Sequence, residues 1–307
     1  MNRENFVLSR PLPLSSLDAL VSHAHRKQSI SGVARFGHAR AGDLSFCDRE
    51  PGAEYNAVAP GSLTLCPENL VELLSQRFAG ITCIAVPDPR SVFIDLGHRL
   101  LSESAVAVSD AVARPFGIHS SATIGVNTQI HPETRIDQAV RVGAHCTIHR
   151  GTWLKAGSTI GDHVTIGAAG MTAYRGLDNR VRKFPHFASV IIAEGAEIGS
   201  GCVLVRGILT STRIGAGCII GNLCNIGHGA EIGECVWMSV GSLIGGHTCI
   251  EDGATLGMAV AVRDNVKIGA RAQVGMGSVV VKSVRPQSSV LGNPAQPLRA
   301  IQAGPSR

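Results

Sequence analysis

A six-residue repeat of apolar side chains constrains the fold of this chain more than any other feature. From Ile118 to Ile166 an apolar residue occupies every sixth position, and the pattern returns from Ile192 to Val280 with one skip of four residues. Six is a multiple of the two-residue period of a strand and not of the 3.6-residue period of a helix, so the same strand face points inward each time. The repeat therefore predicts a parallel β-helix.

The repeat also predicts the size and the filling of this β-helix, called the prism below. Its 25 positions, three to a triangular coil, give about eight coils, with the register after the skip resuming at Ile208. Glycine follows the apolar residue at 13 of these positions, which suits a corner with positive φ or close contact between coils. The position two residues earlier also points inward. It holds four cysteines that we expect to be core residues and not reactive thiols: Cys146, Cys202, Cys218 and Cys224.

The composition excludes several other classes of protein. The chain has 36 glycines among 307 residues, but 44% of its residues are apolar and 17% are charged, without a G-X-Y register, which excludes collagen and disordered chains. The net charge of +5 is spread out and aromatic residues are few, so no nucleic-acid partner is expected. No apolar window approaches the ~18 residues of a transmembrane segment. Nine cysteines, an odd number, fit a reducing compartment, and we expect a cytoplasmic protein.

The repeat divides the chain into two domains and a tail. We expect a small α/β domain with a linker over 1–112, the prism over 113–285 and a short C-terminal tail over 286–307. An excursion at 168–190 interrupts the prism and contains the densest basic cluster of the chain: Arg175, Arg180, Arg182 and Lys183. A loop that carries binding function is one interpretation and a solvated loop is the other.

Within the small domain, caps and periodicity predict three helices and a strand in addition to an apolar stretch around Ile30 to Phe46. These expected elements are a short helix from Ser15 or Ser16 through His25, a helix that Pro67 opens over 67–76, a strand over 81–86 and a further helix over 87–102.

Histidines in the repeat region raise the question of a metal site. Three histidines on a β-helix can bind zinc, but the nearest pair here, His145 and His149, is four residues apart and lacks an obvious third partner. No CxxC pair occurs either. We therefore expect no metal. The other histidines of the region are His163, His228 and His247.

One of these histidines is a candidate general base. His228 follows the inward Ile226 in a corner between Gly227 and Gly229, which leave space beside the imidazole. A histidine is the usual general base for a hydroxyl or an amine, and the glycine-rich backbone around Gly246 offers N–H donors for an oxyanion. From spacing alone, a surface histidine without a catalytic role is the stronger interpretation.

The hexad prism resembles the left-handed β-helix acyltransferases, and the whole chain resembles the UDP-3-O-acylglucosamine N-acyltransferase family, which N-acylates a UDP-sugar in lipid A synthesis. The similarity covers both domains. The catalytic histidine of the family, in an Asn-x-x-x-Ile-x-His context, falls on His228. The other residues in step with the family are Gly170, Lys183, Pro185, Val190, Ile191, Ile192, Glu197, Ile198, Gly199, Arg206, Gly207, Thr212, Asn222 and Cys224.

This resemblance implies a left-handed coil, a homotrimer with active sites between subunits, and an acyl transfer. His228 would take a proton from the sugar amine as it attacks a thioester, and a backbone N–H near Gly246 would stabilise the oxyanion. The donor would be acyl carrier protein or CoA, and no cofactor is expected. Phe46 and Tyr55 would hold the uracil. Substrate contacts are also expected from Asn222, Asn225 and His247, and the aromatic residues Tyr174, Phe184 and Phe187 of the excursion would help to hold the nucleotide sugar.

The chain also departs from the family. Gly221 stands where the family carries an acidic residue, which leaves Glu231 as one possible source of charge support for His228, and Asn265 replaces a second histidine. Tyr55 could fill its role only by way of an insertion. The chain stops at Arg307 without the long helical tail of the family, and its SVLGNPAQPLRA segment resembles the closing motif of hexapeptide acetyltransferases. An acetyl-CoA-dependent nucleotide-sugar acetyltransferase and a non-catalytic nucleotide-sugar-binding β-helix therefore stand as alternatives.

Overall fold

The chain folds into two compact units. The computed structural model describes residues 6–13, 29–53, 55, 58–103 and 115–297. Unit 1 comprises Met1–Arg114, Ala169–Ala188 and Ile208–Thr210, and unit 2 comprises Pro115–Ala168, Ser189–Gly207 and Ser211–Arg307. The excursion that we expected within the prism domain is thus a part of unit 1. The helix expected from Ser15 or Ser16 to His25 and most of the linker lie outside the described residues.

Unit 1 contains a five-stranded sheet with helices on both faces. Phe93 of α2 lies in the core on one face, and Leu74 of α1 lies in the core on the other. The helices and the strand expected over 67–76, 87–102 and 81–86 are confirmed. In sheet order the strands are β1 (Phe6–Pro13), which is antiparallel to its neighbour, and then the parallel β2 (Ser29–Val33), β3 (Asp43–Phe46), β4 (Leu63–Cys66) and β5 (Thr82–Ala85); the helices are α1 (Glu68–Arg77) and α2 (Pro89–Glu103).

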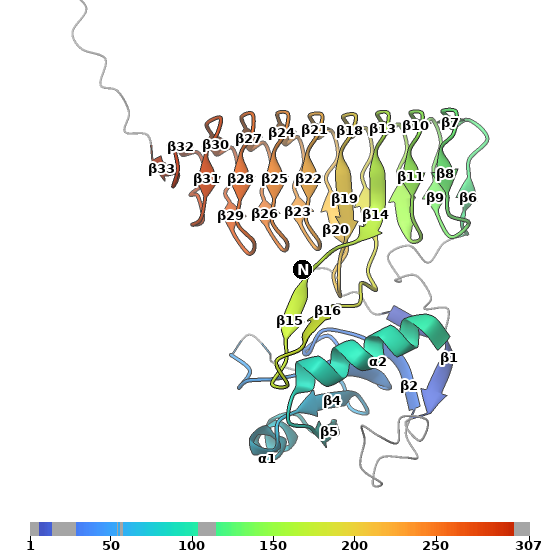
Figure 1. The fold of residues 1–307 in the computed structure, drawn as a ribbon, viewed down its shortest axis with the longest axis vertical. Helices are drawn as coiled ribbons and strands as arrows, with labels where there is room; N and C mark the ends of the chain where they lie inside the picture. Colours follow the sequence, from blue (N-terminus) through green and yellow to red (C-terminus); the bar gives the residue numbers. More distant parts are fainter. Residues whose placement is uncertain (1–5, 14–28, 54, 56–57, 104–114, 298–307) are drawn as a thin grey trace, which may run out of the picture. The chain divides into compact units, whose positions relative to one another are not determined.

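The excursion forms a hairpin that packs within unit 1. Its antiparallel strands β15 (Ala173–Arg175) and β16 (Val181–Lys183) contact α2 (Figure 1). Tyr174 Oη donates to Asp88 Oδ1 at 3.2 Å, and Arg182 pairs with both Asp95 and Asp178. Within the basic cluster, the charge of Arg182 is therefore neutralised by two neighbouring carboxylates.

A second, shorter excursion, Ile208–Thr210, also belongs to unit 1 and includes one of the predicted repeat positions. The repeat predicts that Ile208 points into the prism, but Ile208 packs against the core of unit 1 together with Leu209 and Phe187. The prism register instead resumes at Thr212–Ile214. The prediction for Ile208 was wrong because hydropathy alone does not distinguish an apolar residue that packs inside the prism from one that packs elsewhere.

Unit 2 is a parallel β-helix whose coils stack through three sheets (Figure 1). The first sheet has β6 (Gly117–Ile118), β9 (Arg135–Ile136), β12 (Thr152–Leu154), β17 (Val190–Ile192), β20 (Thr212–Ile214), β23 (Glu231–Ile232), β26 (Cys249–Ile250) and β29 (Lys267–Ile268). The second has β7 (Thr123–Ile124), β10 (Arg141–Val142), β13 (Thr159–Ile160), β18 (Glu197–Ile198), β21 (Ile219–Ile220), β24 (Trp237–Met238), β27 (Thr255–Leu256), β30 (Gln273–Val274), β32 (Ser289–Leu291) and β33 (Gln296–Pro297). The third has β8 (Gln129–Ile130), β11 (Thr147–Ile148), β14 (Thr165–Ala169), β19 (Val203–Arg206), β22 (Asn225–Ile226), β25 (Leu243–Ile244), β28 (Ala261–Val262) and β31 (Val279–Val280).

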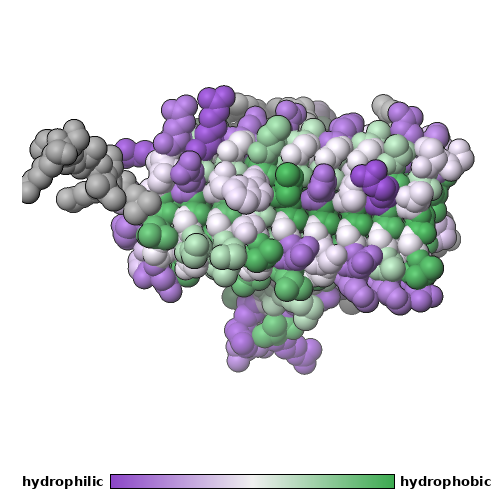
Figure 2. All heavy atoms as spheres, turned by 90° about the horizontal axis from the view of Figure 1, so that it is seen from above, coloured by the Kyte–Doolittle hydropathy of each residue, from purple (hydrophilic) through white to green (hydrophobic). Residues whose placement is uncertain are grey.

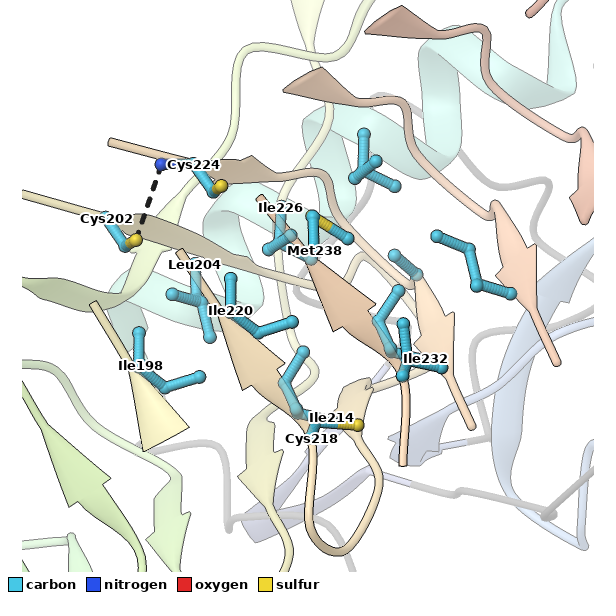
Figure 3. Packing of buried hydrophobic residues seen from close by; sticks show 14 of the residues in the cluster. Ile198, Cys202, Leu204, Ile214, Cys218, Ile220, Cys224, Ile226, Ile232 and Met238 are labelled. Carbon is cyan, nitrogen blue, oxygen red and sulfur yellow. Dashed lines mark hydrogen bonds between the residues drawn. The ribbon is translucent and has the colours of Figure 1, made fainter. Parts of the chain in front are cut away.

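From Ile136 onward, and apart from Ile208, the repeat residues fill the interior of these coils as expected, whereas Ile118 and Ile124 at the start of the prism are 49% and 37% exposed. Ile220, Ile226 and Ile232 are each at most 3% exposed and belong to one continuous core (Figure 3). The four cysteines of the inward position are also buried, and the backbone N–H of Cys224 donates to Cys202 Sγ at 3.4 Å (Figure 3). Burial raises the pKa of Cys218 to about 11, which disfavours the reactive thiolate. The first residues of the tail also join the prism, because β32 pairs with β30.

Glycines at the corners serve two different purposes, which are seen on either side of His228. A Cβ atom on Gly227 would lie 2.7 Å from the backbone N of Gly246 on the next coil, so only glycine permits this close approach. Gly229 instead has φ +64°, in the left-handed region that L side chains rarely adopt. The glycine directly after the inward residue therefore serves close stacking here, and positive φ falls two residues later.

The inward and outward positions of one strand provide a test of the prism core. Ile220 is 1% exposed and Ile219 is 51% exposed, although they are neighbours in β21. Ile220→Ala should lower the free energy of unfolding by about 2–5 kcal/mol, because it leaves a cavity in a packed core. Ile219→Ala is the matched control and should cost roughly 1 kcal/mol or less. Urea unfolding at one protein concentration measures both, and equal losses would contradict the assigned register.

Candidate active site

Parallel pairing places four residues of interest on successive coils. Val203 of β19 lies opposite Asn225, and Asn225 lies opposite Leu243. Continued beyond the strands, this register sets Arg206 opposite His228, His228 opposite Gly246 and Gly246 opposite Asp264. Because hydrogen-bonded parallel strands lie about 4.8 Å apart, these four residues form a single row, called the polar row below.

The His228 ring occupies the space that a side chain at 246 would need. A Cβ atom on Gly246 would lie 2.3 Å from Nε2 and 2.4 Å from Cε1 of His228. The backbone N–H of His247 donates to the carbonyl of His228 at 2.9 Å, and the His247 ring meets the His228 ring edge-on at 4.9 Å. Within the described part of the chain, the N–H of Gly246 has no hydrogen-bond acceptor. The imidazole is thus half-buried directly beside a backbone donor.

Two effects set the protonation of His228. Burial lowers the pKa of the imidazole, and the negative charge of Asp264 opposes this shift. Asp264 is exposed, and Asn265 Nδ2 donates to its Oδ2 at 3.0 Å. Glu231, which we named as a source of charge support, instead lies in β23 between Arg213 and Cys249. The acidic residue that acts on His228 is therefore Asp264, which is 36 residues, or two coils, further along the chain.

The other expected substrate contacts in unit 2 lie at different places. His247 lies beside His228, as described above. Asn225 is exposed on β22 and lines a hollow of about 350 Å³ with Leu243, Ala261 and Val279. Asn222 lies at another corner of the prism, where its Oδ1 accepts a hydrogen bond from the N–H of Ser200 at 2.8 Å. The Asn222 side chain thus links its own coil to the coil of Ser200.

In unit 1 the two aromatic residues expected to hold uracil lie in different clusters. Phe46 packs on Phe93 at 5.0 Å, whereas Tyr55 packs on Phe36 at 5.6 Å. The structure does not bring Phe46 and Tyr55 together.

Phe46 has a different aromatic neighbourhood, which the sequence did not reveal. The Arg90 guanidinium lies 5.9 Å from the Phe46 ring centre and 5.5 Å from that of Tyr174, and it pairs with Asp48. An arginine between two rings is a cation–π arrangement. No sequence pattern links Tyr174 of the excursion to Arg90, so this cluster could only be found from the fold.

The described ranges contain no group of three or more His, Cys, Asp or Glu side chains placed to hold a metal ion. No helix in them is both long enough and apolar enough to cross a membrane. All nine cysteines are free.

Curated relatives match this chain over about two thirds of its length. A UDP-3-O-acylglucosamine N-acyltransferase from Delftia acidovorans is 33% identical over 227 residues, which are 72% of this chain and 67% of that protein. The chain belongs to the UDP-3-O-acylglucosamine N-acyltransferase family. A second member of this family, from Parasynechococcus marenigrum, is 34% identical over 229 residues, or 67% of this chain. The matched part spans 65% of the Parasynechococcus protein's length.

The fold is also found among solved structures. LpxA from Acinetobacter baumannii matches with a TM-score of 0.52 and 21% identity, over 60% of this chain and 72% of that one. This similarity confirms the left-handed β-helix expected from the resemblance. No protein-family model matches the chain.

The charge of Asp264 can be tested directly on His228. Asp264→Asn removes the carboxylate that favours the imidazolium, so the pKa of His228 should fall further below its ordinary value. NMR titration of labelled histidine measures this shift without any substrate. Asp252→Asn is the control, because Asp252 carries the same charge but caps Glu234 at another corner. An unchanged pKa in Asp264→Asn, or an equal fall in the control, would contradict the assignment.

Proposed function

We propose that this protein is an N-acyltransferase that moves an acyl group from a thioester, carried by acyl carrier protein or CoA, to the amine of a UDP-linked amino sugar. The observation that supports this most strongly is the half-buried His228 imidazole beside the N–H of Gly246. Membership of the UDP-3-O-acylglucosamine N-acyltransferase family agrees with it. Lipid A or surface-glycan synthesis is the proposed setting, and the cytoplasm, where free cysteines persist, is the proposed location.

The reaction needs one proton carrier and one oxyanion donor. The neutral His228 takes a proton from the sugar amine as the nitrogen bonds to the thioester carbonyl carbon. The Gly246 N–H stabilises the negative oxygen of the tetrahedral intermediate. When the intermediate collapses to the amide, the C–S bond breaks and the thiolate recovers the proton from His228. The thioester is already activated, so this route uses no metal and no further cofactor.

The electrostatics of His228 suit this role. Burial keeps the imidazole neutral and able to accept a proton near neutral pH, while Asp264 stabilises the imidazolium that forms during transfer. His247, whose ring abuts that of His228, is the proposed substrate contact beside the base. Asn225 and the adjoining hollow are proposed to contact the acyl chain or the sugar.

Unit 1 offers a surface for a planar base. Phe46 and Tyr174, with Arg90 at both rings, are a better candidate than Tyr55, whose ring packs on Phe36 and contacts Gly37. Stacking on aromatic faces and on a guanidinium suits any heterocyclic base. We therefore propose that the base-binding role expected of Phe46 and Tyr55 belongs to Phe46 and Tyr174.

We also propose that unit 2 assembles into a homotrimer. Several large apolar side chains of its later coils are exposed, among them Leu223 at 68%, Leu243 at 56% and Met276 at 64%. Apolar side chains of the prism are visible in Figure 2. Contiguous exposed apolar surface commonly marks a protein interface.

The central experiment removes the proposed base. His228→Ala should reduce the rate of transfer to a UDP-amino sugar by about 10²–10⁴, the usual contribution of a general base. His163→Ala is the matched control, since His163 is also a corner histidine of the prism but stacks on His145 at 5.0 Å. Product masses after incubation with acetyl-CoA or with an acyl carrier thioester identify the donor.

The outcome separates the alternatives. Transfer that survives in His228→Ala would refute the proposed base. Acceptance of acetyl-CoA alone would identify an acetyltransferase, and binding of the nucleotide sugar without transfer from any thioester would identify a non-catalytic protein.

The trimer has a test of its own. Light scattering should give three times the 32.0 kDa mass of the chain. Leu243→Glu places a charge on the exposed apolar surface and should shift the mass toward the monomer, because burying an unpaired charge is costly. Gln273→Glu adds the same charge on an exposed position of another face and should leave the trimer intact. A monomeric wild-type protein would refute the trimer.

A further inference from the structure

Arg206 brings a positive charge into a crowded corner of the prism. Its side chain is half-buried at the end of β19, and its Nε donates to the carbonyl of Gly167 one coil earlier. Gly167 is itself tight against His149, since a Cβ atom there would lie 3.3 Å from His149 Cβ. The guanidinium of Arg206 therefore lies next to Gly167 and near His149. Both residues belong to coils that precede Arg206, whereas Gly246 belongs to a later coil.

The surroundings of Arg206 are positive rather than negative. Arg150 adds a second guanidinium, which pairs with Glu133. Burial, followed by the positive charge of Arg150, lowers the pKa of Arg206 to about 10. Burial, followed by the positive charges of Arg206 and His131, also lowers the pKa of His149.

No counter-charge for Arg206 is present among the residues that the structure describes. Its hydrogen-bond partner is the Gly167 carbonyl, and the nearby carboxylate of Glu133 is held by Arg150. A half-buried cation beside like charges is costly unless an anion joins it. A guanidinium is well suited to phosphate oxygens, which it binds in a forked geometry.

The position of this corner relative to His228 suggests which anion it takes. Extending the pairing of Leu204 with Ile226 by two residues sets Arg206 opposite His228 on the neighbouring coil. One hydroxyl ties the two turns together, because Thr212 Oγ1 donates to the carbonyl of Val205 at 2.6 Å and accepts from the N–H of Gly229 at 2.9 Å. In a nucleotide-linked 2-amino sugar, the amine and the sugar phosphate are on adjacent carbons. A base for the amine therefore requires a phosphate site close by.

We propose that Arg206, with His149 beside it, binds the phosphate groups of the nucleotide-linked amino sugar. This inference rests on the proposed function for the choice of ligand, but the anion site follows from the unpaired guanidinium. Bound phosphate supplies the missing counter-charge and fixes the sugar with its amine toward His228.

Calorimetry on the full chain with three probes tests this site. UDP and inorganic pyrophosphate carry the phosphates, and uridine carries only the nucleoside. Arg206→Gln should weaken binding of UDP and of pyrophosphate by about tenfold or more, as expected for the loss of a charge-assisted bond, and leave uridine binding unchanged. Arg141→Gln is the matched control, because Arg141 is an exposed arginine of the same prism that bonds Thr159. It should bind all three probes as the wild type does.

A second variant guards against misfolding. Arg206→Lys keeps the charge and loses the fork, so it should bind pyrophosphate more weakly than the wild type and more tightly than Arg206→Gln. Unchanged UDP affinity in both Arg206 variants would overturn the proposal, as would an equal loss in Arg141→Gln or a wild-type protein that binds neither UDP nor pyrophosphate.

The same proteins distinguish this inference from the proposed function. Arg206-dependent UDP binding without acyl transfer from any thioester would retain the anion site and reject the transferase. Acyl transfer that depends on His228, together with UDP binding that does not depend on Arg206, would retain the transferase and reject the anion site.

Discussion

The hydrogen bond from one coil to the next is the interaction on which the rest of the structure depends. Gly227 N–H donates to Ile244 O at 2.8 Å, and Gly245 N–H donates to Val262 O at 2.9 Å, one coil further on. Each bond fixes the axial position of a coil to a fraction of an ångström, so residues at equal places in the repeat become neighbours. The polar row exists because of this spacing, and a rigid backbone of this kind is what a preorganised site needs.

The polar row combines groups that favour opposite charges. At one end Arg206 and Arg150 make the corner positive, and at the other end Asp264 carries a negative charge. His228 lies between these ends, where burial favours the neutral imidazole. The absence of a side chain at Gly246 allows the ring and the carboxylate to interact across one coil. The row thus arranges a positive region, a titratable base and a negative region in a line.

Much of this arrangement could be predicted from the sequence, and the exceptions have physical reasons. The hexads predicted the prism, its core and the corner of His228, because a strict period records which side chains point inward. The sequence did not single out Asp264, because 36 residues separate it from His228 and the hexad pattern specifies the inward apolar side chains, not the polar neighbours of a corner. Ile208 was misplaced, and the contact of Arg90 with both Phe46 and Tyr174 was not predicted, because non-repeating segments carry no register.

The three-part composition of unit 1 has a consequence for how this chain can be made and divided. Its core includes Phe187 and Leu209 as well as Leu44 and Phe93, so it draws on segments that a ribosome produces far apart in time. Several coils of the prism, up to Ala168, are synthesised before unit 1 has all of its parts. A fragment cut at the end of the first segment would lack apolar side chains that seal its own core. Unit 1 therefore cannot complete its core until Leu209 has been synthesised, after several coils of the prism.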